Sequence, residues 1–265
     1  MNTLTVLGSG TSTGVPILGC NCQICQSTNP ANKRLRTSVF LSTARGKNIV
    51  VDTSPDLRTQ LLRAEVRHVD AALITHDHAD HTHGIDDLRP FCFHQNQSLP
   101  VHCSQATAAS LRRKFDYIFG PPKRPVIGGG IPRLHLEEFH TEDARIADEI
   151  FTMFDLPHGH VQSTGFMHGK LAYLTDCHSI PPAVAQQLRQ ADLEWLIIDC
   201  VKPEPHDTHM GYVQTRTALE QIQPRRAGLI HMGHEWDHEA LAERLIKDGF
   251  HGAAPLKDGD LIRYS

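Results

Sequence analysis

The stretch Thr75-His76-Asp77-His78-Ala79-Asp80-His81 gathers three histidines and two aspartates in seven positions. It follows the apolar run Ala71–Ile74, which predicts a buried strand ending at the motif. Side chains two apart on an extended chain project to the same side, so His76 and His78 can bind one ion together. Asp80 and His81 enter from the following turn and can serve a neighbouring ion. These ligand types suit Zn²⁺, Mn²⁺ or Fe²⁺, whereas a solvated histidine-rich loop is the alternative interpretation.

The composition is that of an ordinary soluble globular protein. The 265 residues are 40% hydrophobic and 21% charged, which excludes collagen, extended disorder and a simple coiled coil. Lys and Arg number 26 against 30 Asp and Glu, a net charge of −4, so there is no basic excess to indicate a dedicated nucleic-acid binder. The count of 19 histidines is high, and histidine is the commonest metal ligand.

The chain also carries features that bear on its compartment. Residues 1–10 lack a basic segment and an uninterrupted apolar segment, so they predict a first strand and not a signal peptide. No apolar run approaches the roughly 18–20 residues of a membrane span. Seven cysteines are an odd number, and three of them crowd into residues 20–25. This is a poor disulfide framework and favours a reducing, cytoplasmic setting.

Strand-like and helix-like runs alternate throughout, with no linker long enough to divide the chain. We therefore expect a single domain over residues 1–265, with about ten strands and five helices in two sheets with helices outside. The expected strands cover residues 4–7, 38–41, 48–52, 71–75, 99–103, 150–156, 165–168, 171–175, 195–199 and 228–231, with a closing strand at 260–264. The expected helices cover residues 55–64, 106–114, 181–190, 212–221 and 238–247.

The histidine motif has the form His-x-His-x-Asp-His, and in this it resembles the signature of the metallo-β-lactamase superfamily. The resemblance implies the α/β fold of that superfamily, an αββα four-layer sandwich of two mixed β-sheets flanked by helices. It extends to His158, Asp176 and His231, which stand at or just beyond the ends of expected strands. It implies one metal on His76, His78 and His158, a second on Asp80, His81 and His231, and Asp176 as the bridge.

Such a centre has a consequence for substrate charge. Two divalent ions, offset by Asp80, Asp176 and a bridging hydroxide, leave a charge of about +1 on the ions and their ligands, which favours an anionic substrate. The metals would lower the pKa of their shared water and clamp the oxygens of the attacked group. Phosphodiesters, amides, lactones and thioesters can all be cleaved at two-metal sites, so the centre alone leaves the substrate open.

A second cluster lies in Gly19-Cys20-Asn21-Cys22-Gln23-Ile24-Cys25, within a cysteine-rich loop at about residues 19–26. Three thiols so close together need a fourth ligand to complete a tetrahedral structural Zn²⁺ site. His234 is the natural candidate, three residues after His231, although His238 competes with it. Free buried thiols are the alternative. The remaining cysteines, at positions 92, 103, 177 and 200, show no metal spacing and are expected in the core.

The opening Gly8-Ser9-Gly10-Thr11-Ser12-Thr13-Gly14-Val15-Pro16, followed by the cysteine triplet, is similar to the PhnP-type phosphodiesterases of the carbon–phosphorus lyase pathway and its relatives. The resemblance implies phosphonate metabolism and hydrolysis of small cyclic phosphodiesters, of the ribose cyclic phosphate or 2′,3′-cyclic nucleotide class. It implies two active-site ions, Mn²⁺ or Zn²⁺, besides the structural Zn²⁺. A homodimer is common in this family.

A general acid must protonate the leaving alkoxide. The segment Asp207-Thr208-His209-Met210-Gly211 resembles the place where PhnP-type enzymes carry such a histidine, and His209 is favoured over His206. Asp80 and His209 are thus the expected catalytic residues, with a metal-bound hydroxide as the nucleophile. The chain departs from the nearest PhnP pattern around residues 201–209 and in a longer loop, Phe115–Pro132, which leaves the physiological ester open.

The loop Phe115–Pro132 is rich in Gly and Pro, which predicts little regular structure and either a surface loop or one that covers substrate. A tRNA-processing endonuclease of the superfamily would need a long arm and a strongly basic surface. A lactonase or thioesterase would share most of the ligands. A non-catalytic carrier resembling PqqB has a similar cysteine triplet. We expect a small-molecule phosphodiester as partner, with no membrane and no stable nucleic-acid partner; three metal ions per chain favour the enzyme and one favours the carrier.

Overall fold

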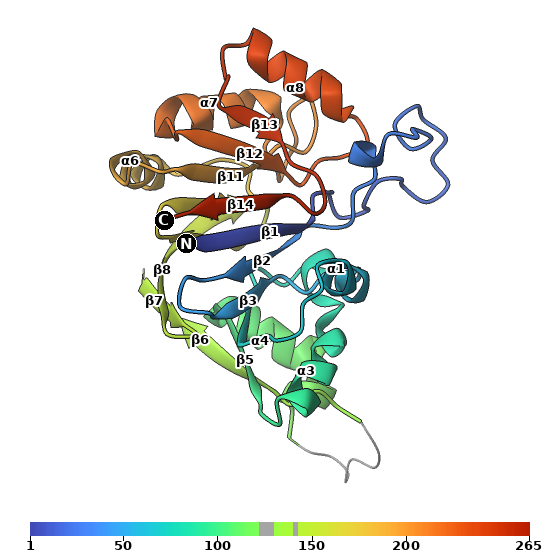
Figure 1. Ribbon diagram of the computed structural model, residues 1–265, viewed down its shortest axis with the longest axis vertical. Helices are drawn as coiled ribbons and strands as arrows, with labels where there is room; N and C mark the ends of the chain where they lie inside the picture. The colour runs from blue at the N-terminus through green and yellow to red at the C-terminus, as the bar shows by residue number, and fades with distance from the viewer. Residues whose placement is uncertain (122–129, 140–142) are drawn as a thin grey trace.

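The computed structural model describes residues 1–121, 130–139 and 143–265, and places two mixed sheets face to face (Figure 1). Across the first sheet the strands are β14 (Leu261–Tyr264), β1 (Asn2–Gly8), β2 (Ser38–Ser42), β3 (Asn48–Val51), β4 (Ala71–Leu73), β5 (Leu99–Ser104) and β6 (Leu134–Phe139). Across the second they are β13 (Ala253–Pro255), β12 (Arg226–Ile230), β11 (Trp195–Asp199), β10 (Leu171–Leu174), β9 (Val161–His168), β8 (Glu149–His158) and β7 (Asp143–Ile146).

Helices lie on the outer face of each sheet. Those of the first sheet are α1 (Leu57–Arg63), α2 (Ala79–Thr82), α3 (Arg89–His94), α4 (Gln105–Lys114) and α5 (Asp116–Phe119), with the 3₁₀ turns η1 (Pro30–Asn32) and η2 (Ile85–Leu88) in its loops. Those of the second sheet are α6 (Pro182–Gln190), α7 (Tyr212–Ile222) and α8 (His238–Lys247). In Figure 1, α7 and α8 lie toward the top and α3 and α4 toward the bottom, with α1 and α6 nearer the middle.

Three apolar clusters hold these layers together. The central one joins the facing sides of the sheets, with Val39 and Ile49 from the first and Phe166 and Ile197 from the second. A second cluster lies between the first sheet and helices α1, α3 and α4, and a third between the other sheet and α6, α7 and α8. Alternate residues of a strand point to opposite faces, so each sheet contributes side chains both to the central cluster and to the cluster under its helices. The four-layer αββα prediction is confirmed.

Strand direction gathers many loops at one edge. The strands β3, β4 and β5 run parallel in the first sheet, and β10, β11 and β12 run parallel in the second. Strand β8 pairs antiparallel with β9, which pairs antiparallel with β10, so β8 and β10 share a direction. The segments that follow these strands carry the histidine-rich motif and most of the other expected ligands.

The structure differs from the sequence expectation in several elements. It adds strands β6, β7 and β13 and the short helices α2, α3 and α5, and it starts β9 earlier, at Val161. Helix α5 falls inside Phe115–Pro132, where little regular structure was expected. Phe115 is buried, and Ile118 and Phe119 pack on the cluster beneath α4, so tertiary packing stabilises this single turn. The rest of that loop, residues 122–129, lies outside the described residues.

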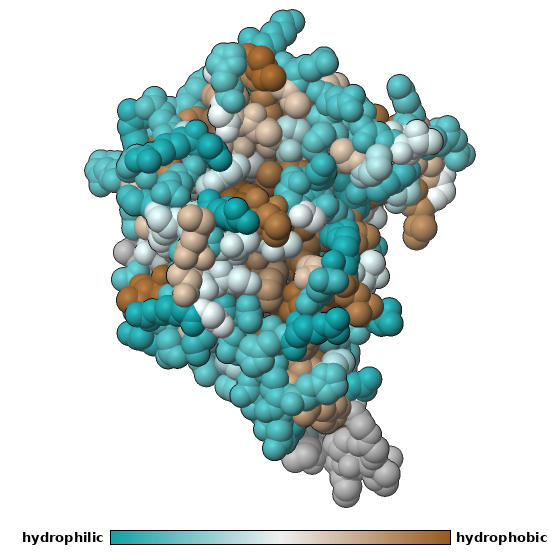
Figure 2. Space-filling model, in the orientation of Figure 1, coloured by the Kyte–Doolittle hydropathy of each residue, from teal (hydrophilic) through white to brown (hydrophobic). Residues whose placement is uncertain are grey.

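Within the described part of the chain, none of the helices combines the length and the apolarity that crossing a membrane would require. Hydrophilic residues cover most of the face in Figure 2, with apolar ones between them in smaller areas.

Candidate metal centre

Loops from both sheets meet at the edge reached by the parallel strands. The segment between β4 and α2 supplies His76 and His78, and β8 ends at His158. The three residues offer ligand atoms that lie within 4.8 Å of one another. His158 Nε2 lies 3.2 Å from His78 Nδ1, and the His76 ring lies 4.5 Å from that of His78. The structure thus brings together the three side chains expected on one metal.

The residues expected on the other metal also converge. Asp80, Asp176 and His231 offer ligand atoms within 4.8 Å of one another, and so do His76, His81 and Asp176. His81 Nε2 lies 3.2 Å from Asp80 Oδ2 and 3.3 Å from Asp176 Oδ1. Asp176 takes part in groups with both sets of histidines, which is the position that a bridging carboxylate requires.

Three residues at this edge have left-handed backbone conformations although none is glycine. Asp52 has φ 62°, Asp176 has φ 54° and His231 has φ 59°. Asp52 directly follows β3 and His231 directly follows β12, whereas one residue separates Asp176 from the end of β10. Such a conformation costs about 1–3 kcal/mol for a residue with a side chain, and it is concentrated at functional sites. All three side chains take part in contacts at the centre: Asp52 and Asp176 with His81, and His231 with Asp176.

Second polar groups orient the imidazoles. Asp52 Oδ2 lies 2.7 Å from His81 Nδ1, and Asp52 is itself held by the backbone and hydroxyl of Thr75. The Thr37 hydroxyl lies 3.0 Å from His231 Nδ1, and the Thr11 hydroxyl lies 3.2 Å from Nε2 of the same ring. A hydrogen bond on one ring nitrogen fixes which nitrogen faces a metal. The sequence prediction missed Asp52 and Thr37, and the only local signal was that Asp52 directly follows the apolar strand β3.

The electrostatics of the cluster fit cations. Burial opposes charge on His81, yet Asp176, Asp52 and Asp80 outweigh it and raise the pKa of this imidazole well above its ordinary value. On His76 burial prevails and holds the pKa well below the ordinary value. Among the described residues, the buried Nε2 atom of His76 has no hydrogen-bond partner, and that of His81 lies against the carboxylates of Asp80 and Asp176. Imidazole nitrogens beside buried carboxylates form a donor set that divalent cations match.

His209 lies at the rim of this cluster, on the loop between β11 and α7. Its ring is 4.7 Å from that of His158 and stacks at 4.7 Å on His231. Its Nδ1 lies 3.0 Å from Asp199 Oδ2, another contact that the sequence did not reveal. Burial raises the pKa of Asp199 to about 8 and lowers the pKa of His209. His209 also lies near enough to His158 and Asp176 to share an ion with them.

The cysteine triplet forms a separate cluster with His234. The Sγ atoms of Cys20, Cys22 and Cys25 lie 3.4, 3.5 and 3.5 Å from His234 Nδ1. All seven cysteines are free thiols. The Cys25 backbone N–H donates to Cys22 Sγ and, with other hydrogen bonds, lowers the pKa of Cys22 to about 6, whereas burial raises that of Cys25 to about 11. Three sulfurs around one imidazole nitrogen fit a tetrahedral zinc ion.

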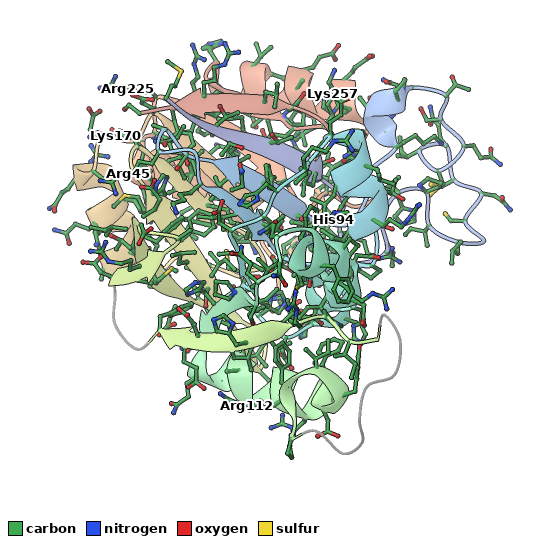
Figure 3. The ribbon with its side chains drawn as sticks, turned by 60° about the horizontal axis from the view of Figure 1, so that its bottom comes forward. Arg45, His94, Arg112, Lys170, Arg225 and Lys257 are labelled. Carbon is green, nitrogen blue, oxygen red and sulfur yellow. The ribbon has the colours of Figure 1, made fainter. Side chains whose placement is uncertain are left out.

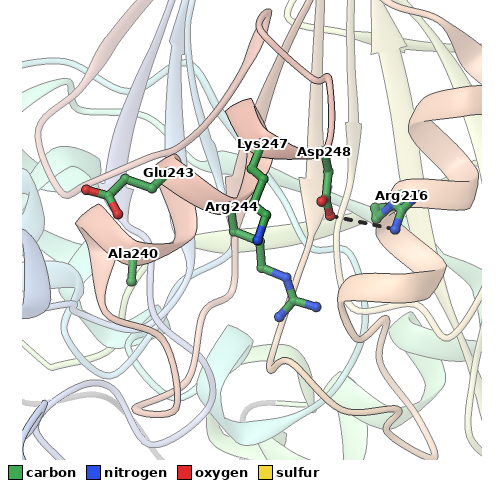
Figure 4. Close-up of a pocket in the computed structure, with 6 residues that line it drawn as sticks. All are labelled: Arg216, Ala240, Glu243, Arg244, Lys247 and Asp248. Atoms are coloured by element: carbon green, nitrogen blue, oxygen red, sulfur yellow. Dashed lines mark ion pairs between the residues drawn. The ribbon is translucent and has the colours of Figure 1, made fainter.

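A hollow of about 520 Å³ lies elsewhere, between α7 and α8 (Figure 4). Arg216 pairs there with Asp248 at 3.6 Å, while Arg244 lies 4.0 Å over the Tyr212 ring. None of its lining residues belongs to the clusters above.

Comparison with known proteins identifies relatives of the whole chain. A family model described as "Beta-lactamase superfamily domain" matches residues 47–232. A crystal structure described as "a New Diphosphatase from the PhnP Family" has 33% sequence identity and a TM-score of 0.89, and covers 100% of this chain and 98% of that one.

Two curated proteins give further matches. An "Octanoyltransferase" from Porphyromonas gingivalis is 34% identical over 264 residues, which are 97% of this chain and 52% of that protein. A "Coenzyme PQQ synthesis protein B" from Methylobacterium nodulans is 30% identical over 129 residues, 43% of this chain and 41% of that protein. The matches therefore cover about half, or less, of the length of these two relatives.

Proposed function

Since the chain belongs to the beta-lactamase superfamily, and within it to the PhnP family, we propose that it is a metal-dependent phosphodiesterase. The observation that carries the proposal is the convergence of two ligand groups on one shared carboxylate, that of Asp176. One ion would be held by His76, His78 and His158, and the other by Asp80, His81 and His231.

When bound, two divalent ions supply a nucleophilic water at neutral pH and positive charge beside the phosphate oxygens. The residues of the chain complete the reaction. The Asp199 carboxyl is hydrogen-bonded to His209 Nδ1, which holds the ring so that its Nε2 would donate the proton to the departing oxygen. Asp52 and Thr37 hold His81 and His231 in the orientation that binding needs.

The proposed substrates are small cyclic phosphodiesters of the ribose cyclic phosphate or 2′,3′-cyclic nucleotide class. The family relative described as a diphosphatase supports phosphate chemistry. In Figure 3, Arg45, Lys170 and Arg225 lie near one another at the upper left, whereas Lys257 lies at the upper right and Arg112 at the bottom. The net charge of −4 provides no basic excess of the kind that a tRNA-processing enzyme would use, which favours a small substrate.

The remaining assignments complete the proposal. The active-site ions are Mn²⁺ or Zn²⁺, and Cys20, Cys22, Cys25 and His234 hold a structural Zn²⁺ that secures the loop at about residues 19–26. The chain acts as a single domain over residues 1–265, can form a homodimer and works in the cytoplasm, where cysteine side chains stay reduced.

A second candidate is hydrolysis of an acyl thioester at the same centre. It is favoured by the Porphyromonas gingivalis relative, whose name describes octanoyl transfer. Because this chain matches half of that protein, the name applies to a larger molecule, and phosphodiester hydrolysis stays the leading proposal.

The experiment is an assay of Mn²⁺-loaded protein on 2′,3′-cyclic AMP, bis-p-nitrophenyl phosphate and an octanoyl thioester, with an Asp80→Ala variant as the control. We expect turnover of both phosphodiesters and its loss in the variant. Turnover of the thioester alone would replace the proposal with the second candidate. Inactivity on all three, with fewer than two ions bound at the centre, would favour a carrier.

A further inference from the structure

The loop between β11 and α7 carries two histidine rings side by side. The centroid of His206 lies 5.1 Å from that of His209, at an interplanar angle of 65°. His209 in turn contacts His158 and His231, whereas His206 is half-buried and one ring further from the ligand cluster. His206 is therefore the ring that a group bonded to the leaving oxygen would meet next to His209 on this loop.

The hydrogen bonds of His206 settle its tautomer. The Thr208 backbone N–H donates to His206 Nδ1 at 3.2 Å, and the Thr208 hydroxyl lies 3.3 Å from the same nitrogen. A backbone N–H can only donate, so Nδ1 of the neutral ring carries no proton and Nε2 does. Within residues 1–121, 130–139 and 143–265, no protein acceptor is found for that Nε2–H.

Thr208 also fixes the ring relative to the metal centre. Its carbonyl oxygen lies 2.9 Å from His158 Nδ1, so one residue holds both a proposed ligand and His206. The turn between β8 and β9 approaches closely, because a Cβ on Gly159 would lie 2.8 Å from Thr208 Cγ2. Burial, His209 and Lys202 lower the pKa of His206 below its ordinary value.

We propose that His206 is a specificity-determining residue whose Nε2–H donates to an oxygen of the sugar or other polyol that carries the leaving group. This inference rests on the proposed function and names the part of the substrate that the metal ligands do not recognise. A ribose offers hydroxyl and ring oxygens within a few bonds of the leaving oxygen. A p-nitrophenyl ester offers only a nitro group at the far end of its ring. The two histidines thus have different roles: His209 protonates the leaving oxygen at the scissile bond, and His206 binds the polyol beyond it.

The test measures binding by calorimetry to the Mn²⁺-loaded protein, with adenosine 3′-monophosphate and inorganic phosphate as probes. His206→Phe keeps an aromatic ring without the donor, and His206→Gln keeps an N–H donor. We expect His206→Phe to weaken nucleotide binding about five- to tenfold, the effect of one lost hydrogen bond, with phosphate binding unchanged. His206→Gln should restore most of the loss. His160→Phe, a histidine exposed on the turn between β8 and β9, is the matched control.

Kinetics give the second readout. His206→Phe should raise KM for 2′,3′-cyclic AMP and leave kcat, and bis-p-nitrophenyl phosphate turnover, near the original values. Unchanged nucleotide binding, or equal losses for nucleotide and phosphate, would overturn the assignment. A hundredfold fall in kcat would also overturn it, because His206 would then be the proton donor. If the unaltered protein hydrolyses neither phosphodiester, the proposed function itself fails. That result comes from the unaltered protein alone, so it is distinct from any effect of the variants.

Discussion

Single side chains at the metal centre are held by partners at the ends of different strands. His81 is oriented by Asp52, His231 by Thr37 and His209 by Asp199, each across a hydrogen bond of 2.7–3.0 Å. Imidazole has two nitrogens, and a partner on one of them leaves the other free for a metal or a proton. Substitutions of single residues can therefore distinguish a metal ligand from a proton donor.

His209→Ala should separate the acid role from a ligand role. Loss of a general acid costs about 10²- to 10⁴-fold, so turnover of 2′,3′-cyclic AMP should fall in that range. Bis-p-nitrophenyl phosphate should lose far less, because its leaving group needs little protonation. Kinetics on both substrates, with metal analysis and His160→Ala as the control, check this. Equal losses together with a missing ion would mean that His209 binds metal.

Asp52→Asn should weaken metal binding although Asp52 is not itself a proposed metal ligand. Removing the carboxylate behind a ligating histidine typically costs about 10–100-fold in metal affinity. Chelator competition measures the affinity. Asp70→Asn is the matched control, because Asp70 accepts a backbone hydrogen bond from Asn48 in the same sheet, at 2.8 Å. Equal metal affinity in both variants would remove Asp52 from the centre.

At the scale of elements, two segments support the residues after His231. The cysteine-rich loop reaches His234, and helix α8 begins a few residues later with Asp237 as its N-cap. Asp237 accepts from the backbone of Glu239 and Ala240 and from Asn32 Nδ2, so it joins the helix to the loop that follows the cysteines.

Cys22→Ser should remove one zinc ion and destabilise the loop. A hydroxyl is a poor replacement for the thiolate in a tetrahedral zinc site, and structural zinc contributes directly to folding. Elemental analysis should find one ion fewer than in the unaltered protein, and the melting temperature should fall. Gln23→Ala, an exposed neighbour in the same loop, is the control. Unchanged zinc content with full stability would contradict the structural site.

Asp237→Ala should lower the free energy of unfolding by about 1 kcal/mol through loss of the cap. Burial works against the charged carboxylate, but hydrogen bonds from Asn32, Ala240 and Glu239 outweigh it and lower its pKa below 3.8. A depressed folded-state pKa stabilises the protein above the unfolded value, and that contribution is lost as the pH falls through the folded value. Urea unfolding should therefore show a larger deficit at pH 7 than at pH 3. A deficit that grows toward acid would refute this role.

At the scale of the whole molecule, the metal centre links the two sheets. His76, His78, Asp80 and His81 follow a strand of the first sheet, whereas His158, Asp176 and His231 end or follow strands of the second. Bound ions would hold these halves together at one edge, in addition to the central apolar cluster.

Metal removal should therefore lower the stability of the entire fold. A ligand at a hundred times its Kd stabilises by about 2.7 kcal/mol. For a chain of this size that corresponds to roughly 5–10 °C in the melting temperature. Calorimetry before and after chelation of the active-site ions, with Asp80→Ala as a variant that should respond less, measures the effect. An identical melting temperature with and without metal would show that apolar packing alone joins the sheets.

Local patterns account for much of what could be predicted. The motif at residues 75–81 and the cysteine triplet are contiguous, so their ligand types can be recognised without a fold. Helix α8 begins and ends as expected, at His238 and Lys247, because its cap and apolar spacing are local. The superfamily prediction is confirmed by the family match and by the architecture. Strands β6, β7 and β13 were missed because pairing with neighbours defines them more than their own composition does.

The sequence alone indicates that this protein binds metals, since histidine, aspartate and cysteine side chains in these spacings suit metal ions in any packed structure. Only the tertiary structure decides which of 19 histidines meet. Asp176 is predicted through the resemblance to the superfamily, but Asp52, which follows β3, and Asp199, which ends β11, have nothing in their local sequence that distinguishes them from other strand ends. They become partners because two sheets pack with their parallel strand ends at one edge. Contacts between residues so far apart in sequence depend on that packing and leave no local pattern to read.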